Sequence, residues 1–351
     1  MTLKTLWLTL LLLGSCASWK QKDFEKSLEK SPDPTPEVTK EAAPILEKFE
    51  VKDVKEEPRP VAPVEVKKVT SVKKKTETKK APEKKVAEKK PEAPVVKGPP
   101  AHYPEEMNAL NEKGKKVWEQ YEPNHHHHIG EKIFLDIHYL GMTVGKIMVT
   151  NQGKKMIDNK EVWHFHARFK SAPFYSSIYE LDDTVDTYVT TDKFQSLKYT
   201  VIQRESKVEV DDIQLFDHEA FKVYWLYRQE RSGKKKNKKE EKFIPYYSID
   251  PFSSLFLYQG LPLKNGDVYE IPVVNKGKVL IMRAKVEARE TIETETGVRK
   301  AIRLQATTAY SGDKLKSGDM TFWFSDDERR SLLKAQAKIS LGSVTADIVK
   351  E

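Results

Sequence analysis

The sequence predicts an all-β domain in roughly its last two thirds, folded as an antiparallel meander that forms an open or incomplete barrel or sandwich. Three observations predict this class. From residue 129 onward, apolar and polar side chains alternate with a period of two, as in half-buried strands. Turn signals such as Asp158-Asn159 and Ser232-Gly233 separate the runs. One stretch near residue 250 breaks the alternation and predicts a short inserted helix.

The first residues have the features of an export signal. Lys4 precedes an apolar run from Leu6 to Leu13, and small residues follow before Cys16, the only cysteine of the sequence. A span across a bilayer takes about 20 apolar residues, so this run is too short. Residues 1–15 are therefore predicted to be a signal peptide. With a single cysteine, a disulfide within the chain is excluded.

The segment Leu13-Gly14-Ser15-Cys16 resembles the lipobox of bacterial lipoproteins. The resemblance implies cleavage before Cys16, a diacylglycerol on its thiol and an acylated amino terminus. Two acyl chains are enough for stable anchoring in a bilayer. Because Ala17 follows the cysteine, the resemblance also implies the outer membrane, with the domain facing the periplasm. An ordinary signal peptide with a chance cysteine is the alternative.

Residues 16–101 are predicted to form a long disordered tether, rich in Lys, Glu and Pro. Residues 66–97 contain twelve lysines and four glutamates, which gives this segment a net charge of +8. The whole chain has the same formal charge of +8, so the rest of the sequence sums to zero. Because the chain is predicted to be exported, nucleic acid is an unsuitable partner for this basic segment. Peptidoglycan or other anionic envelope polymers suit it better, and salt should weaken such contacts. A short amphipathic helix is predicted within the tether at residues 44–51.

Residues 102–128 are predicted to hold an amphipathic helix and a histidine tract. Apolar side chains recur at helical spacing from Met107 to Tyr121, and Pro104 suits a first turn. Gly114 interrupts the narrow apolar stripe. We expect the helix to pack against the following domain, and contact with a membrane surface is the alternative.

Two groups of histidines are candidate metal ligands. The tract consists of His125, His126, His127 and His128. Consecutive imidazoles can chelate Zn²⁺, Ni²⁺ or Cu²⁺ loosely, and a solvated tract is the alternative. His164 and His166 alternate with aromatic positions of one strand, so we expect this pair to face solvent.

The domain at residues 129–351 is predicted from its alternating runs. The clearest runs lie at residues 163–169, 179–189, 221–227 and 280–286. Asp250 and Pro251 supply a helix N-cap and a first-turn proline, and Gly260 ends the predicted helix. A helix inserted there could cover or plug one end of an open barrel.

The landmarks of this domain resemble a bacterial family, DUF3108, defined as a domain of unknown function. They include Tyr139-Leu140-Gly141, Asp250-Pro251 with the helix after it, and the run Phe322-Trp323-Phe324-Ser325-Asp326-Asp327. The resemblance covers about residues 129–351 and implies an exported β domain. It brings no activity and no catalytic residue.

The sequence holds no recognisable catalytic motif. GxSxG, HExxH, phosphate-loop and dinucleotide motifs are absent from it. Paired acids at residues 182–186, 211–212 and 326–327 are expected in turns and on solvated faces, with hydrolysis or Ca²⁺ binding as the minor alternatives. The lysine run at residues 234–239 is expected to be an exposed hairpin loop, or else a contact for anionic lipid headgroups or wall polymers.

The leading functional hypothesis is a non-catalytic binding or scaffold role for a membrane-anchored envelope protein, with no cofactor. The alternative is a carrier or sensor of an apolar ligand, such as a lipid, held in an open barrel cavity. The candidate lining residues are Trp163, Phe165, Phe169, Trp225 and Phe256. Plain core packing is the other interpretation of each of these side chains.

Overall fold

A computed structural model describes residues 34–35, 43–54, 98–122, 129–310, 320–339 and 341–350. Within these ranges fifteen strands join in one sheet. The strands are β1 (Lys52–Asp53), β2 (Lys132–Tyr139), β3 (Met142–Ile157), β4 (Lys160–Ser171), β5 (Asp182–Thr190), β6 (Ser196–Glu205), β7 (Val208–Asp217), β8 (Lys222–Arg231), β9 (Lys234–Phe243), β10 (Val268–Asn275), β11 (Lys278–Thr294), β12 (Gly297–Tyr310), β13 (Met320–Ser325), β14 (Leu332–Ile339) and β15 (Gly342–Ile348). The helices are α3 (Ala43–Lys48), α4 (Glu105–Trp118), α5 (Pro173–Ser176) and α6 (Ser253–Gln259).

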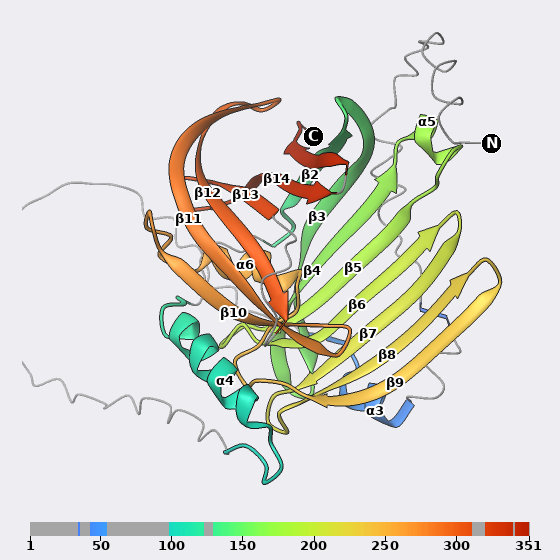
Figure 1. Ribbon diagram of the computed structural model, residues 1–351, viewed down its shortest axis with the longest axis vertical. Coiled ribbons are helices and arrows are strands. Elements are labelled where there is room, and N and C mark those ends of the chain that lie inside the picture. Colours follow the sequence, from blue (N-terminus) through green and yellow to red (C-terminus); the bar gives the residue numbers. More distant parts are fainter. Residues whose placement is uncertain are drawn as a thin grey trace, which may run out of the picture.

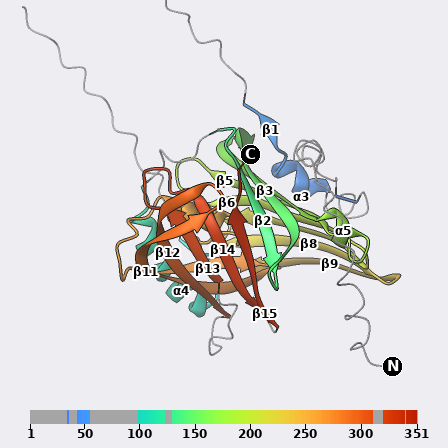
Figure 2. The ribbon, with the colours of Figure 1, turned by 90° about the horizontal axis from the view of Figure 1, so that it is seen from above.

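The sheet is an antiparallel meander that curls without closing. Its path runs from β10 through β15, crosses to β2 and ends at β9, so the first and last long strands of the domain are neighbours. The two strands left without a shared ladder are β9 and β10, which are consecutive in the sequence. Figure 1 shows the two halves of the sheet curving toward each other around α6, and Figure 2 shows the curled sheet from above. The predicted open meander with an inserted helix is confirmed.

Tight turns and bulges let the long strands curl. Asp158 and Asn159 have φ angles of 47° and 59°, and Ser232 and Gly233 have 50° and 77°. Two central residues with positive φ match the twist of antiparallel strands, which explains why these predicted turn signals are correct. Strand β3 changes register between Asn151 and Lys154, and β11 does so between Val286 and Ala288. Such bulges bend a strand and increase its twist.

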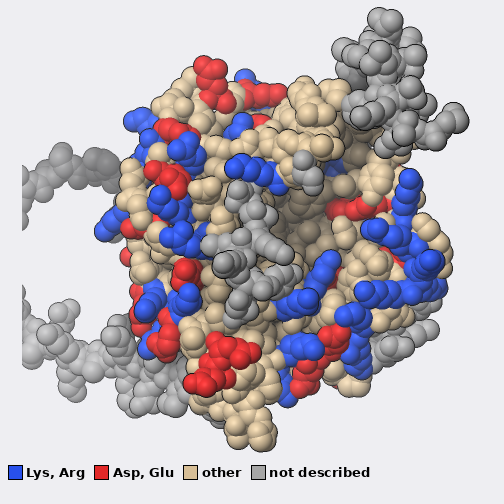
Figure 3. Space-filling view, in the orientation of Figure 1, with Lys and Arg blue, Asp and Glu red and all other residues tan. Residues whose placement is uncertain are grey.

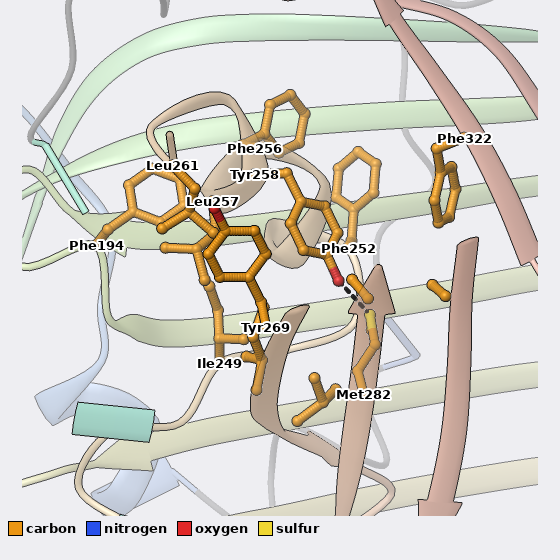
Figure 4. Close-up of a cluster of buried hydrophobic side chains, with 14 of the residues drawn as sticks. Phe194, Ile249, Phe252, Phe256, Leu257, Tyr258, Leu261, Tyr269, Met282 and Phe322 are labelled. Carbon is orange, nitrogen blue, oxygen red and sulfur yellow. Dashed lines mark hydrogen bonds between the residues drawn. The ribbon is translucent and has the colours of Figure 1, made fainter. Parts of the chain in front are cut away.

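Helix α6 lies inside the curl and supplies much of the core. Phe256, Leu257 and Tyr258 are buried there, and the Tyr258 hydroxyl donates to Met282 Sδ at 3.0 Å (Figure 4). The Phe256 ring stacks on Phe165 of β4 with centroids 3.8 Å apart. The inserted helix therefore fills the inside of the curl, whereas the sequence left open whether it would cover or plug one end of an open barrel.

Asp250 fixes the start of α6. Its carboxylate accepts hydrogen bonds from Thr187 Oγ1 at 2.5 Å, Ser196 Oγ at 2.5 Å and Ser253 Oγ at 2.6 Å. The backbone N–H groups of Phe252 and Ser253 also donate to it, both at 2.9 Å. Burial raises the pKa of Asp250 above its ordinary value, against the opposing effect of these donors. The helix begins at Ser253 with Phe252 at the N-cap, so Asp250 lies two residues before the N-cap position that the sequence predicted for it.

Helix α4 packs against the domain, as expected. Leu110 and Val117 join the main hydrophobic core, and α4 lies along β10. Gly114 is also buried, at a point where a Cβ atom would lie 2.4 Å from the carbonyl oxygen of Tyr247. The glycine that interrupts the apolar stripe is therefore the contact point between helix and domain.

Two sequence expectations need correction. Residues 43–54 lie within the predicted tether of residues 16–101, but they form α3 and β1 and pack on the outer face of the sheet. The helix predicted at residues 44–51 is confirmed in part, because α3 ends at Lys48. The lysine run at residues 234–239 is not a loop, because it belongs to the edge strand β9. Its turn is the shorter Ser232-Gly233 pair, so the lysines continue the ladder with β8.

The variant Gly114→Ala should lower the free energy of unfolding by about 1–3 kcal/mol, the range of overpacked sites. Alanine normally stabilises a helix over glycine by about 1 kcal/mol, but here its methyl group would clash with the Tyr247 backbone. Urea unfolding of the full chain measures the change. Lys116→Ala, at an exposed position of the same helix, is the control and should be close to neutral. A stabilised Gly114→Ala variant would contradict the close contact.

Candidate binding cleft

A cleft opens at the seam between β9 and the β10–β11 hairpin. One part has a volume of about 480 Å³ and reaches the start of α4, and an adjoining part has about 230 Å³. The lining residues that both parts share are Trp225, Lys238, Lys276 and Lys278. Figure 3 shows Lys and Arg side chains gathered over the β8 and β9 side of the molecule, beside a hollow in the middle of the view.

The floor of the cleft is aromatic and comes from the alternation of β8. Val223, Trp225 and Tyr227 face the inside of the curl, and the last two have ring centroids 5.4 Å apart. Trp225 Nε1–H donates to Asp212 Oδ1 of β7 at 3.0 Å, which fixes the orientation of the indole. The floor is therefore a fixed surface rather than a set of mobile side chains.

The rim of the cleft is basic. Five lysines and one glutamate, Glu240, line the two parts, an excess of four positive charges. Lys238 Nζ lies 4.8 Å from the centroid of the Trp225 ring, and Lys276 Nζ lies 5.6 Å from that of Tyr227. Ammonium groups so close to aromatic faces are held by cation–π attraction. A ligand with a negative group and a flat or apolar body would suit this combination.

The tip of the β10–β11 hairpin forms one wall by resting on the inner face of β7 and β8. The N–H of Gly277 donates to Gln214 Oε1 at 3.2 Å. A Cβ atom at Gly277 would lie 3.3 Å from Trp225, and the φ of this residue is 65°, so glycine fits on both counts. The hairpin thus narrows the seam by contact with side chains and not by a strand ladder.

Two carboxyl groups on the inner face have raised pKa values. Burial raises the pKa of Asp212, beneath Trp225, to about 7, although Lys276 and the indole N–H oppose this. Burial likewise raises the pKa of Asp183 on β5 to about 6, against hydrogen bonds from Gln203 and the Arg204 N–H. These acids were expected on solvated faces, and the structure shows that expectation to be wrong.

The predicted aromatic lining residues fall into two groups. Trp225 lines the cleft. Phe165 and Phe256 are stacked on each other in the core, and Trp163 and Phe169 are partly buried against that core. Packing around α6 therefore accounts for four of the five, and the open cavity expected around them is filled at these positions.

The histidine pair on β4 is not solvated, contrary to expectation. His164 Nε2 and His166 Nδ1 both donate to Asp186 Oδ1, at 2.7 and 2.9 Å. Burial of Asp186 disfavours its charge, yet these two hydrogen bonds hold its pKa at about 2. The pair lies on the outer face of the sheet, so it does not contribute to the cleft.

Other predicted sites lie outside the described residues. These are Cys16, the tract of His125, His126, His127 and His128, and the lysine-rich segment at residues 66–97. Acylation, metal binding and contact with peptidoglycan stay predictions there. In the described ranges, no group of three or more His, Cys, Asp or Glu side chains is placed to hold a metal ion. None of the helices in those ranges has the length and apolarity to cross a bilayer.

Sequence reasoning offered the lysine run at residues 234–239 as a contact for anionic lipid headgroups, but it did not place these lysines in a cleft with Trp225, and it missed Lys276 and Lys278. Alternation along residues 234–243 could have indicated that Lys236 and Lys238 share a face, had the run been assigned to a strand. Lys276 and Lys278 carry no such signal, because they meet β8 only through the long-range docking of their hairpin.

Asp212→Asn should increase stability at high pH and flatten its pH dependence. Because the pKa of Asp212 is raised on folding, its carboxyl contributes fully to the free energy of unfolding below its ordinary pKa of 3.8. That contribution is lost as pH rises through about 7, where the buried carboxyl ionises. The amide still accepts from Trp225 but cannot ionise. Denaturant unfolding should show a gain near zero at pH 3.5 and up to about 4 kcal/mol at pH 8.

Asp192→Asn, at an exposed acid, is the matched control for this titration. An equal gain from Asp212→Asn at both pH values would show that the carboxyl is not responsible.

Known proteins with related structures differ strongly in sequence. A β-barrel-like protein with a domain of unknown function, DUF1849, from Brucella abortus has 9% identity, covering 63% of this chain and 96% of its own, with a TM-score of 0.42. An exported protein with a YmcC-like fold from Bacteroides fragilis has 8% identity, coverages of 65% and 96% and a TM-score of 0.29. A protein described as a lipoprotein from Parabacteroides distasonis has 8% identity, coverages of 63% and 94% and a TM-score of 0.30.

No curated protein sequence matches the chain. A family model, described as protein of unknown function (DUF3108), matches residues 135–349, which is more than half of the sequence. This range contains the meander, α6 and both sides of the cleft. The landmarks noted in the sequence are confirmed, and the chain belongs to the DUF3108 family.

Proposed function

We propose that this protein is a lipid-anchored lipoprotein of the cell envelope whose β domain binds an acidic lipid without chemically changing it. The observation that carries the proposal is the fixed aromatic floor of Trp225 and Tyr227 beneath a rim of lysines. Binding sites of this type combine an apolar body with a few well-placed polar groups that set specificity.

An amphiphile fits the cleft better than a purely polar anion does. Next to the lysines, the larger part of the cleft has apolar walls from Met107 of α4, Phe243 of β9 and Val279 of β11. Lysine acts as a point charge toward phosphate groups. An acidic headgroup at the rim and an acyl chain along these walls would therefore satisfy both kinds of surface.

The seam suits a ligand better than the interior around α6 does. Phe165, Phe256 and Tyr258 fill that interior with side chains, whereas the cleft lies open at the rim of the sheet. This supports the binding hypothesis and moves the site of the lipid-carrier hypothesis from the barrel cavity to the seam.

A non-catalytic role agrees with the buried polar cluster. Ser196 and Ser253, the hydroxyls beside Asp250, are both 0% exposed, so no substrate reaches them in this conformation. Their hydrogen bonds serve the start of α6.

Anchoring at Cys16, with the domain facing the periplasm from the outer membrane, is part of the proposal and rests on the sequence. Cys16→Ser should abolish incorporation of labelled fatty acid and release the protein from membranes. Retention of label in this variant would remove the anchor from the proposal.

Replacing the lysines on the inner face of β9 should weaken lipid binding. Lys236→Gln with Lys238→Gln removes two charges from the rim, and near an anionic surface each lysine contributes about 1 kcal/mol. The dissociation constant for monomeric short-chain phosphatidylglycerol, measured by titration calorimetry on the full chain, should rise about 30-fold. Phosphatidylcholine of equal chain length should bind weakly to every variant.

The matched control uses the same strand. Lys235→Gln with Lys239→Gln changes net charge equally but acts on side chains that alternate to the opposite face of β9. It should leave the dissociation constant within about twofold. Equal losses in both double variants would mean that net charge alone attracts the lipid, and no binding by the wild type would end the proposal.

A further inference from the structure

An apolar patch lies on the outer face of the sheet, on the side opposite the cleft. Val162 of β4 belongs to it, whereas the neighbouring Phe165 points inward to the core. The buried residues of the patch that come from the sheet are Ile157, Val162, Leu197, Ile213, Leu215 and Leu226. Uncovered, this patch would expose side chains of five strands, from β3 to β8, to water.

The N-terminal segment at residues 43–54 covers this patch. Phe49 is only 2% exposed and belongs to the same cluster, with Ile45, Leu46 and Val51 packed around it. Figures 1 and 2 show α3 and β1 on the outer side of the sheet. An aromatic side chain so fully removed from water contributes strongly to association.

Polar contacts fix the position of this segment. Lys52 pairs with Met156 and Asp53 with Lys155 in a short antiparallel ladder. Lys48 Nζ lies 2.6 Å from Asp217 Oδ2, and Lys155 Nζ lies 2.6 Å from Asp53 Oδ1. Backbone pairing, ion pairs and apolar burial therefore select one register on the sheet.

The chain is held on the domain again after residue 97. Tyr103 donates from its hydroxyl to the carbonyl of Ile244 at 2.9 Å, and its ring packs edge-on against Phe221 and Phe243. The following helix α4 lies along β10. Both ends of residues 55–97 therefore join parts of the chain that are docked on the same domain.

We propose that residues 43–54 bind the outer face as a strap with its own affinity for the sheet, which makes residues 55–97 a loop attached to the domain at both ends. The lysines of that loop then do not separate the domain from the N-terminal anchor. Because Thr35 already donates to Asp211 Oδ2 of β7 at 2.5 Å, that separation is set by the 18 residues 17–34, which span at most about 60 Å when fully extended, instead of the roughly 85 residues of the predicted tether.

A cut within the loop tests whether the strap holds without covalent connection. A single specific protease site is placed between Lys80 and Ala81 of the full-length protein, which is then cut and separated by size-exclusion chromatography under native conditions. We expect the N-terminal fragment to co-elute with the domain. If the N-terminal fragment elutes apart from the domain when no other residue has been changed, the proposal is overturned.

Phe49→Asp should release the fragment after cleavage, with affinity lowered by at least about 100-fold because a buried aromatic contact is lost. Glu47→Ala, at an exposed position of helix α3 just before Phe49, is the matched control and should retain it. Retention of the Phe49→Asp fragment would show that the apolar patch is not the binding surface.

A competition experiment avoids any change to the folded protein. A synthetic peptide of residues 40–54 in excess should displace the N-terminal fragment from the cut wild-type protein, and the same peptide with Phe49→Asp should not. Equal behaviour of the two peptides would contradict the proposal. The strap is independent of the lipid cleft, since it uses the other face of the sheet.

Discussion

The buried carboxyl of Asp250 is the group on which the arrangement of sheet and helix depends. It collects hydrogen bonds from β5, from β6 and from the first turn of α6, so it joins the helix to the inside of the curl. A buried carboxyl without such donors would be strongly unfavourable. Next to it, Ile249 exchanges backbone hydrogen bonds with β10, at 3.1 Å from its N–H and 2.8 Å to its carbonyl. The connection between β9 and β10 is thereby drawn inward, and the two strands cannot meet as a hairpin.

The open seam between β9 and β10 follows from this path. The two strand edges at the seam are protected in different ways. Along β10 the edge is covered by α4, which approaches closely enough for Gly114 to touch Tyr247. On β9 the edge carries lysines, which discourage pairing with another strand. The hairpin tip at Gly277 then rests on Trp225 and narrows the gap. The cleft is what remains between a charged edge, a docked hairpin and a covering helix.

Local patterns predicted the strands and turns well, because alternation and positive-φ turns depend on neighbouring residues. Asp158-Asn159 and Ser232-Gly233 are examples, and Asp250-Pro251 correctly marked the inserted helix. Alternation also placed His164 and His166 opposite the core, but it could not reveal that both donate to Asp186 and that His166 is buried. Of the cleft, Trp225 was predicted as a lining residue, and the lysine run at residues 234–239 was offered as a headgroup contact without a place in the fold. Its lysines become neighbours through contacts between β8, β9 and a hairpin some 40 residues later, which no short pattern records.

The pairing of β2 with β15 has a consequence for how the domain acquires its structure. Val344 of β15 lies opposite Tyr139 of β2, about 200 residues away in the chain, so this ladder closes only when nearly the whole domain is present. Contacts between such distant residues slow folding, because the entropy of a long loop must be lost before they form. During synthesis, β2 would wait with one edge unpaired while the intervening hairpins assemble. Until β15 is synthesised and pairs with it, the free edge of β2 can therefore pair with a wrong strand.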